Sequence, residues 1–449
     1  MVVKSKQASP KRWAILILLA ALYFFTDWVA FSVSPNSTVF EKQFSGLDSS
    51  KLVVVFLCAS LVVGIFCSSL FRLMGTRNAI LLAAFLLFVG NLVKSGVPFL
   101  LEYESTACLY IGFAIAGGAQ PLVQTSMLET ITLWFPAEER DMAIGVSATA
   151  GDIGIALSYL IGSYIADDKF DIRLYLDVLT IIGMVLFVFS LIFFSERPPA
   201  GKTRNGTRCI SQVEELKEST FAEDWKIACD YLQAPGFPLY IFLAAYATTI
   251  TDIVGTYLEE IYNKLDFSDD FSVSLVGGAY FIMVLVAACQ IGRLQQCIRG
   301  RDGSNNLFSF LLTLCGCSGV LLYAMIPCLL GDSVIICSLV LVALACFIGP
   351  LKSMGVTLSA DAVHPTNEIR LAMVEMLFIN GCSASVVFMF GELQDLNLTV
   401  PYVVNFCILG SFGLFCAFCV TSQHKVLKNH DRVHLIADEE KEPLIEDET

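Results

Sequence analysis

Long apolar runs dominate the pattern of hydrophobic and polar positions along this chain. A helix needs about 20 apolar residues to cross a bilayer core of about 30 Å, and each run is about that long or longer. The pattern therefore predicts an all-α polytopic membrane protein with 12 transmembrane helices, arranged as six and six. The runs fall at 13–33, 52–74, 79–101, 107–133, 142–166, 174–195, 237–262, 271–298, 307–330, 334–360, 369–391 and 401–421.

Polar stretches divide the chain into four parts. Residues 1–195 form an N-terminal six-helix half, 237–421 a C-terminal six-helix half, and 422–449 an acidic tail. Residues 196–236 form a linker that opens with the basic, turn-rich RPPAGKTRNGTR. Its second part, SQVEELKESTFAEDWKIACDYL, is typical of an amphipathic helix at a membrane surface.

Composition supports the membrane assignment. Only 16% of the 449 residues are charged and 56% are hydrophobic, whereas soluble domains carry about 25% charged residues. The net charge of −14 comes with acidic residues in outer loops and the tail, so no nucleic-acid partner is expected. The 16 cysteines lie mostly inside apolar runs, which predicts neither a disulfide framework nor a metal site, and no cofactor is expected.

Basic residues predict the orientation in the bilayer. With the N-terminus inside, 21 of the 28 lysines and arginines fall on the cytosolic side. Positive charge concentrates on the cytosolic side of membrane proteins, so both termini are expected in the cytosol. The glycosylation sequons at Asn36 and Asn397 would then face outside, and Asn205 would lie in the cytosolic linker.

An internal repeat links the two halves. Four pairs of matching residues are separated by the same offset, which indicates duplicated halves. The arrangement resembles the major facilitator superfamily, and this resemblance implies a solute site between the halves near the bilayer midplane. The pairs are Pro121 and Pro350, Pro136 and Pro365, Ala143 and Ala372, and Trp28 and Tyr257.

Ionisable residues inside the apolar runs are candidates for function, because charge is costly to bury in lipid. Asp252 lies in mid-span and is expected to bind the solute or a proton. Four further residues are candidates for coupling or ion pairing: Asp27, Asp152, Lys352 and Glu375. A cavity with more acids than bases favours a cationic or zwitterionic solute, or proton coupling.

The segment FRLMGTRNAI after the second run contains a candidate gating loop. Facilitators carry a motif close to GxLxDRxGRR here, whose basic residues and glycine form a tight cytosolic turn. This chain keeps Arg72, Gly75 and Arg77 but lacks the acidic residue. Arg140, after the fourth run, is assigned to the same gate.

Residues 119–162 carry a narrower resemblance. Gln120 lies fourteen residues before Trp134, and Trp134, Phe135, Pro136 and Arg140 form a WFP-x-x-x-R element. Together with Gly154, and with Trp28, Phe31 and Ser32 in the first run, this segment resembles the feline leukaemia virus subgroup C receptor family. Members of that family are transporters associated with haem, choline and ethanolamine.

The resemblance implies that Trp28 and Gln120 line the solute cavity. An indole face attracts an ammonium group by about 0.5–2 kcal/mol, which suits a choline-like or ethanolamine-like solute. The family's seventh-helix aromatic falls near Asp252, with Tyr246 and Tyr257 as other candidates. This chain also differs from the family by carrying Glu129 in place of a basic residue and Asp152 in place of an amide or proline.

The acidic tail contains a candidate sorting signal. Glu440, Leu444 and Ile445 have the spacing of an acidic dileucine motif, which an endocytic adaptor would bind. The plasma membrane is the favoured location, and an endosomal or lysosomal membrane is the alternative.

The sequence therefore predicts a transporter that moves a small organic solute by alternating access. A choline-like or ethanolamine-like cation or a haem-like metabolite is favoured. The alternatives are a proton-coupled carrier of another metabolite, and a membrane receptor or chaperone subunit that transports nothing. An enzyme is not expected, because no nucleophile–base pair or phosphate-binding loop is present.

Overall fold

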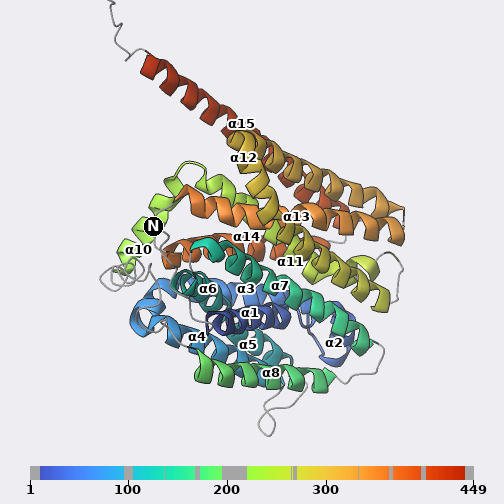
Figure 1. Ribbon diagram of the computed structural model, residues 1–449. Coiled ribbons are helices and arrows are strands. Elements are labelled where there is room, and N and C mark those ends of the chain that lie inside the picture. The colour runs from blue at the N-terminus through green and yellow to red at the C-terminus, as the bar shows by residue number, and fades with distance from the viewer. Residues whose placement is uncertain are drawn as a thin grey trace, which may run out of the picture.

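The computed structural model describes residues 11–95, 105–135, 137–166, 172–194, 220–263, 265, 270–331, 333–363, 368–395 and 401–439. Regular structure in these ranges is helical throughout (Figure 1). The first half contains α1 (Lys11–Ala30), η1 (Ser34–Asn36), α2 (Ser37–Gln43), α3 (Ser49–Ile65), α4 (Cys67–Lys94), α5 (Thr106–Gly117), α6 (Gln120–Trp134), α7 (Ala137–Ala166) and α8 (Ile172–Phe193). The remainder contains α10 (Phe221–Gln233), α11 (Phe237–Asn263), α12 (Asp270–Leu330), α13 (Val334–Ala362), α14 (Glu368–Asp395) and α15 (Pro401–Glu439).

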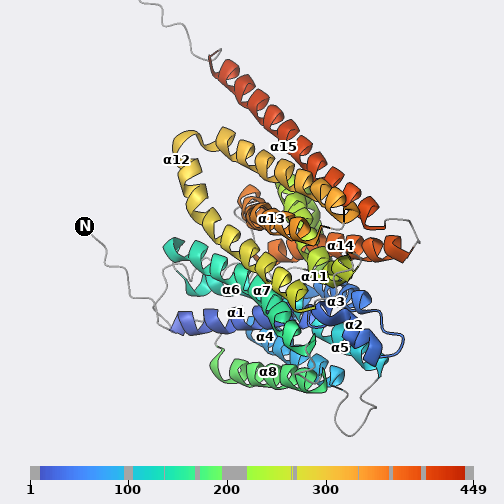
Figure 2. The same cartoon turned by 90° about the vertical axis from the view of Figure 1, so that its right-hand side faces the viewer.

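Twelve apolar helical segments are present in the described ranges. Ten helices are long and apolar enough to cross a membrane, and Ser49–Ile65 and Thr149–Gly162 are shorter apolar helices. Helix α12 bends between two limbs, so it carries the eighth span at Val273–Gln290 and the ninth at Leu307–Leu330 (Figure 2). The prediction of an all-α protein with 12 transmembrane helices is confirmed.

The two halves pack side by side through a small set of helices. Helices α1 to α8 form the lower layer in both views, and α11 to α15 form the upper layer (Figures 1 and 2). Across the interface, α7 packs along α12, and α3 and α6 pack against α14. Polar residues carried by these helices are therefore brought between the halves.

Glycine allows α7 to approach α1 closely. A Cβ atom added at Gly154 would lie 2.1 Å from the backbone oxygen of Phe24, and one at Gly151 would lie 2.1 Å from Oδ2 of Asp27. Both distances are far below van der Waals contact. At Gly154 the close atom is backbone, so only glycine fits there without a shift of the helices, whereas at Gly151 the Asp27 side chain would have to move. This contact places the Asp27 carboxylate next to the turn of α7 that carries Asp152.

The bundle has two distinguishable ends (Figure 1). We call the end that carries α10 the linker face and the end that carries α2 the far face. Helix α10 is the amphipathic helix expected in the linker: Thr220 and Glu223 form a reciprocal capping box at its start, and Asp224 and Ala228 are buried. At the other terminus, α15 continues to Glu439 and passes the expected end of the last span at residue 421.

Candidate functional site

A group of polar side chains lies between the halves, and we call it the central polar cluster. The first half contributes residues from α1, α6 and α7, and the second half contributes residues from α11, α13 and α14. Every member except Lys352 is buried, and Lys352 is partly exposed. The cluster comprises Tyr23, Asp27, Gln120, Asp152, Asp252, Lys352, Asn380 and Ser383.

An ion pair joins the halves within this cluster. The Nζ atom of Lys352 lies 2.8 Å from Oδ1 of Asp152. The side chain of Asp152 is 3% exposed and that of Lys352 is 22% exposed. Because charges that leave water need a partner, this pair explains how α7 and α13 each carry an ionisable residue in an apolar span.

Two further carboxylates lie within electrostatic reach of the pair. Asp27 interacts with Lys352, Asp152 and Asp252, and Asp252 interacts with Lys352 and Asp152. Ser383 of α14 donates a hydrogen bond to Oδ2 of Asp252. Three carboxylates thus share one ammonium group, and full ionisation would leave two negative charges without an ammonium partner among these four side chains.

Amide groups complete the cluster. Asn380 Nδ2 donates to Oε1 of Gln120 at 3.2 Å and to Oγ of Ser60 at 3.1 Å, so α14 is hydrogen-bonded to both α6 and α3. Gln124 Nε2, one helical turn after Gln120, donates to the hydroxyl of Tyr23 at 3.2 Å. This geometry places Gln120 at the interface between the halves, and its role in lining the solute cavity stays a prediction.

Trp28 points away from the cluster. Its Nε1 atom donates to the hydroxyl of Tyr175 on α8 at 3.1 Å, and its ring packs edge-on against Phe24 and Phe25. Helix α8 lies on the side of the first half remote from the second half (Figures 1 and 2). With its N–H committed to Tyr175, the indole packs within the first half, and its role in lining the solute cavity stays a prediction.

The two candidate tyrosines of the second half also lie elsewhere. The hydroxyl of Tyr246 is 3.2 Å from Oγ of Ser318, and its ring packs on Phe412, so it lies inside the second half. Tyr257 donates to the backbone oxygen of Val387 at 2.8 Å, near the far face. Neither ring joins the central polar cluster, and a role of either tyrosine in solute binding stays a prediction.

Glu375 forms a separate buried pair. Ser359 of α13 donates a hydrogen bond to Oε1 of Glu375 on α14, so both partners belong to the second half. The Glu375 side chain is buried, but its hydrogen bond holds it to α13 and not to the interface between the halves. The contact lies within the second half, and the coupling role of Glu375 stays a prediction.

The candidate gating loop lies on the linker face. Gly75 has φ of 75°, a left-handed conformation that favours glycine and turns the chain between the second and third spans. Arg72 bonds Oγ of Ser69 at 2.9 Å and pairs with Asp224 of α10 at 3.3 Å. Arg77 is exposed and donates to the backbone oxygen of Leu191 on α8 at 3.4 Å. Arg140 lies in the first turns of α7, and its side chain is outside the described part of the structure.

Of the candidate glycosylation and sorting residues, only Asn36 lies within the described part of the chain. Asn36 is 1% exposed, and a Cβ atom at Gly162 would lie 3.1 Å from its Nδ2 atom, so a glycan has no access to this amide in the observed conformation. Glycosylation of Asn36 stays a prediction that would require another conformation of this segment. Asn397, Glu440, Leu444 and Ile445 lie outside the described residues.

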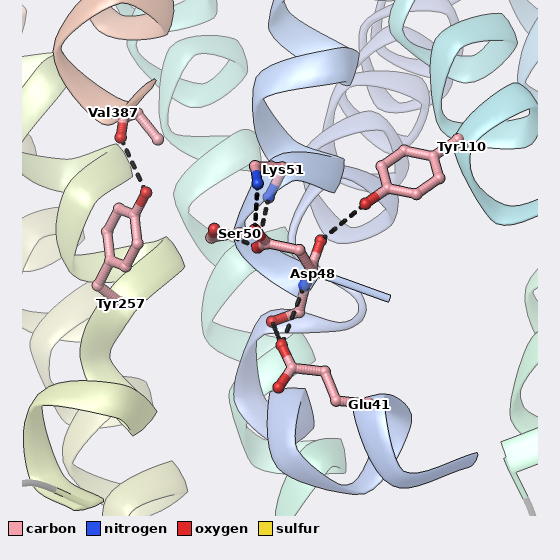
Figure 3. A network of polar contacts seen from close by, with 8 residues as sticks. Glu41, Asp48, Ser50, Lys51, Tyr110, Tyr257 and Val387 are labelled. Atoms are coloured by element: carbon pink, nitrogen blue, oxygen red, sulfur yellow. Dashed lines mark hydrogen bonds and ion pairs between the residues drawn. The ribbon is translucent and has the colours of Figure 1, made fainter. Parts of the chain in front are cut away.

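A cavity of about 260 Å³ opens between the halves near the far face. Glu41, Asp48 and Lys51 line it from the first half, and Tyr257 and Glu392 line it from the second (Figure 3). Burial alone would raise the pKa of the Asp48 carboxyl. Hydrogen bonds from Lys51 and Ser50 have the larger effect, so the pKa lies below its ordinary value.

Several residues that the sequence interpretation missed take part in these contacts. Asn380 and Ser383 are three residues apart, so they share one face of α14 within an otherwise apolar run, and this polar pair was the available signal. Glu259 lies seven residues after Asp252 on the same face of α11 and bonds to the start of α2. In the described residues, His, Cys, Asp and Glu do not gather in groups of three that could hold a metal ion.

Solved structures share this architecture. The partially occluded inward-open structure of the xylose transporter XylE from E. coli aligns with a TM-score of 0.66 at 16% identity and covers 91% of this chain and 97% of that one. A crystal structure of D-xylose-proton symporter aligns with a TM-score of 0.67 at 15% identity, covering 91% and 97%. At this level of identity the likeness concerns the fold.

Two relatives match part of the sequence. Solute carrier family 49 member A3 of Xenopus tropicalis is 27% identical over 158 residues, which cover 34% of this chain and 33% of that protein. The uncharacterized protein B0416.5 of Caenorhabditis elegans is 23% identical over 190 residues, covering 40% and 37%. The chain thus spans little more than a third of the length of the curated relatives that it matches.

The family model extends over most of the chain. It matches residues 16–388, from the first span to the eleventh, and therefore includes both halves and every helix that contributes to the central polar cluster. The chain belongs to the Major Facilitator Superfamily.

Proposed function

We propose that this transporter carries a small organic cation by alternating access, with the central polar cluster as its binding site. The excess of carboxylates over ammonium groups between the halves is the observation that carries this proposal. In a site of low dielectric constant, a cation that enters gains more from these carboxylates than it would in water. Choline-like and ethanolamine-like solutes have the required charge and size, and a haem-like metabolite is the alternative solute class.

Asp252 is the residue that we expect to meet the solute. Its only described side-chain partner in the cluster at hydrogen-bond distance is a neutral serine hydroxyl, whereas Asp152 is paired with Lys352. A hydroxyl orients a carboxylate without neutralising it, so the charge of Asp252 remains available to a cation. Asp27, with Gly151 packed against it, supplies a second carboxylate on the opposite side.

Binding of choline to the purified protein tests this proposal. Asp252→Asn should weaken choline binding about tenfold or more, because about 1.4 kcal/mol of charge attraction is lost. Glu375→Gln is the matched control, since Glu375 is also buried and bonded to a serine but lies outside the cluster. Uncharged dimethylbutanol, which has the shape of choline, should not bind the wild type. Equal binding of both compounds, or equal effects of the two substitutions, would contradict the proposal.

Proton coupling is the second candidate function. Three carboxylates around one lysine favour uptake of a proton as much as of a cation. One of the structurally similar proteins, D-xylose-proton symporter, couples its solute to protons. If protons are the coupled ion, Asp252→Asn should remove the pH dependence of uptake while choline binding remains intact. A receptor or chaperone subunit without transport activity would show no solute flux in any variant.

We further propose that both termini lie in the cytosol, so the linker face is cytosolic. The concentration of basic residues in the segments on that side supports this orientation. Cysteine labelling from outside intact cells should reach residues introduced in 264–269 and should fail at 201–219. Labelling of the linker from outside would reverse the orientation.

The plasma membrane is the proposed location, and the tail is the proposed adaptor site. Leu444→Ala with Ile445→Ala should shift the protein toward the cell surface if an adaptor binds the dileucine spacing. An unchanged distribution between surface and endosomes would show that the spacing has no sorting role.

A further inference from the structure

A buried tyrosine hydroxyl lies beside the central polar cluster. Tyr280 of α12 is fully buried, and among the described residues its hydroxyl has no partner at hydrogen-bond geometry. Such a hydroxyl is costly to bury, because it gives up its bonds to water and gains none in return. Buried polar atoms without a partner are rare in folded proteins, so each one needs a physical explanation. The Tyr280 hydroxyl is available to a polar group of another molecule.

The packing of α12 against its neighbours determines where this hydroxyl lies. A Cβ atom added at Gly349 of α13 would lie 2.3 Å from the backbone oxygen of Val284, which is one turn after Tyr280 on α12. On the α11 side, Tyr280 interacts with Thr251, whose own hydroxyl donates to the backbone oxygen of Ala247 at 3.0 Å. The hydrogen of Thr251 is thus directed within its own helix and does not satisfy Tyr280.

The same hydroxyl is within electrostatic reach of the charged groups of the cluster. Tyr280 interacts with Asp152, Lys352 and Asp252. Its neighbour Thr251 directly precedes Asp252, and consecutive Cα atoms are about 3.8 Å apart. A small solute whose cationic end meets the Asp252 carboxylate can therefore bring a second polar group to Tyr280. Adjacent helices, α11 and α12, would then recognise two different groups of one solute.

Two other hydroxyl groups near the cluster are less suited to this role. Tyr23 already accepts a hydrogen bond from Gln124 at 3.2 Å, so it has a partner without a solute. Thr249, three residues before Asp252 on the same face of α11, is buried and also without a partner among the described residues. A threonine on a helix can turn its hydroxyl to the carbonyl one turn earlier, whereas the Tyr280 hydroxyl is fixed at the end of a packed ring.

We propose that Tyr280 is a specificity-determining residue that hydrogen-bonds a hydroxyl group of the solute, so that the site prefers an amino alcohol to an alkylammonium ion of the same size. The inference rests on the proposed cation site and adds the second group that the solute must carry. An alkylammonium ion meets Asp252 equally well, but it leaves the Tyr280 hydroxyl buried without a partner. Sites that hydrogen-bond a solute hydroxyl reject analogues that lack it for this reason.

Binding of choline and of propyltrimethylammonium to the purified full-length protein tests the inference. The second compound has the same charge and carries a methyl group where choline has its hydroxyl. The wild type should bind choline about tenfold more tightly, which corresponds to about 1.4 kcal/mol. Tyr280→Phe should weaken choline binding about tenfold and leave propyltrimethylammonium within about twofold, so that the two compounds bind alike. The unfolding temperature should not fall, because no hydrogen bond within the protein is lost.

Tyr246→Phe is the matched control, because Tyr246 is also a buried tyrosine of the second half but its hydroxyl contacts Ser318. That change should leave the affinity ratio of the two compounds unaltered. Equal losses for both compounds in Tyr280→Phe would overturn the inference, as would loss of selectivity in Thr249→Val but not in Tyr280→Phe.

The affinities of the wild type separate failure of this inference from failure of the cation site. If both compounds bind the wild type equally, the cation site stands and the role of Tyr280 is overturned. If neither compound binds, the proposed cation site fails and the inference fails with it. The ratio measured on the wild type needs no variant, so it decides the matter even if Tyr280→Phe does not fold.

Discussion

At the residue scale, four of the buried carboxylates in the described part of the chain accept a hydrogen bond from a hydroxyl group. A hydroxyl group can donate to a carboxylate of either protonation state, so such an acid can exchange a proton or bind a cation without losing its anchor. Asp152 differs, because an ammonium group already balances it. The hydroxyl contacts are Ser383 to Asp252, Ser359 to Glu375, Thr76 to Glu129 and Thr38 to Glu259.

The observed contacts of Trp28 provide a test of its role at this scale. Trp28→Phe keeps an aromatic ring but removes the N–H that bonds Tyr175, which should cost about 1 kcal/mol of stability. Choline affinity should remain within about twofold of wild type, since that ring does not enter the cluster. Thermal unfolding and a binding titration measure the two quantities. A large loss of affinity at unchanged stability would return Trp28 to the binding site.

Asp48 connects stability to pH. It caps α3 by accepting from the backbone N–H of Lys51 at 3.3 Å, and its pKa is lowered in the folded protein. A lowered folded pKa means that the stabilisation is present above the unfolded pKa of about 3.9 and is lost as pH falls through the folded value. Asp48→Ala should cost about 0.5–1 kcal/mol at pH 7, at the low end for a cap because the site is partly exposed.

Unfolding temperatures of the two proteins between pH 7 and pH 3 check this expectation. The difference between wild type and Asp48→Ala should be constant down to about pH 4 and then shrink. A difference that grows on acidification would mean that another group controls the effect.

At the element scale, close helix contacts through glycine determine where the charged residues lie. Gly154 brings α7 against the backbone of α1, and this contact orients the helix face that carries Asp152 toward the second half. A helix turned by one residue would move that carboxylate by about 100° around the axis. The position of the ion pair therefore depends on a packing contact only two residues away along α7.

Gly154→Ala tests this dependence. The added methyl would overlap the backbone of α1, so we expect a loss of about 1–3 kcal/mol in stability together with reduced uptake. Gly316→Ala is the matched control, because nothing lies within 4 Å of a Cβ atom there. That change should leave uptake unaltered and slightly stabilise α12. Equal behaviour of the two variants would show that the close contact has no role in the site.

The elements were predictable from the sequence to a greater extent than the site. Hydropathy identifies spans because each helix has to match the bilayer, and that requirement is local. Side-chain partners depend on how each helix is rotated against its neighbours, which hydropathy does not encode. Asp152, Asp252 and Lys352 were identified because charge in lipid is rare, whereas the partner of Trp28 could not be predicted because an indole is compatible with both a cavity and a packed interior.

At the scale of the whole molecule, polar contacts between the halves occur at three levels. Asp224 joins them on the linker face, the central polar cluster in the middle, and Glu259 on the far face. A carrier that alternates between two open states has to break one outer contact while the other forms. The pair of Asp152 and Lys352 lies between them, where rocking of the halves would change its environment.

A double-mutant cycle on this pair tests whether it connects the halves. Lys352→Gln alone leaves the Asp152 carboxylate buried without its ammonium, which should cost about 3 kcal/mol. Asp152→Asn alone should cost a similar amount, and the double variant should recover most of the loss, because no buried charge is left at the pair. Thermal unfolding with and without each change gives the interaction free energy.

Uptake in the same double variant then separates packing from transport. If the pair only stabilises the folded protein, the double variant should be stable and should transport at the wild-type rate. We expect instead a stable protein with uptake reduced about tenfold or more, because the remaining carboxylates Asp27 and Asp252 lose the ammonium group that offsets their charge when the site is empty. Control variants at Glu375 and Ser359, the buried pair within the second half, should not affect uptake. Wild-type uptake in the double variant would confine Asp152 and Lys352 to a structural role and leave Asp27 and Asp252 as the residues that bind the solute.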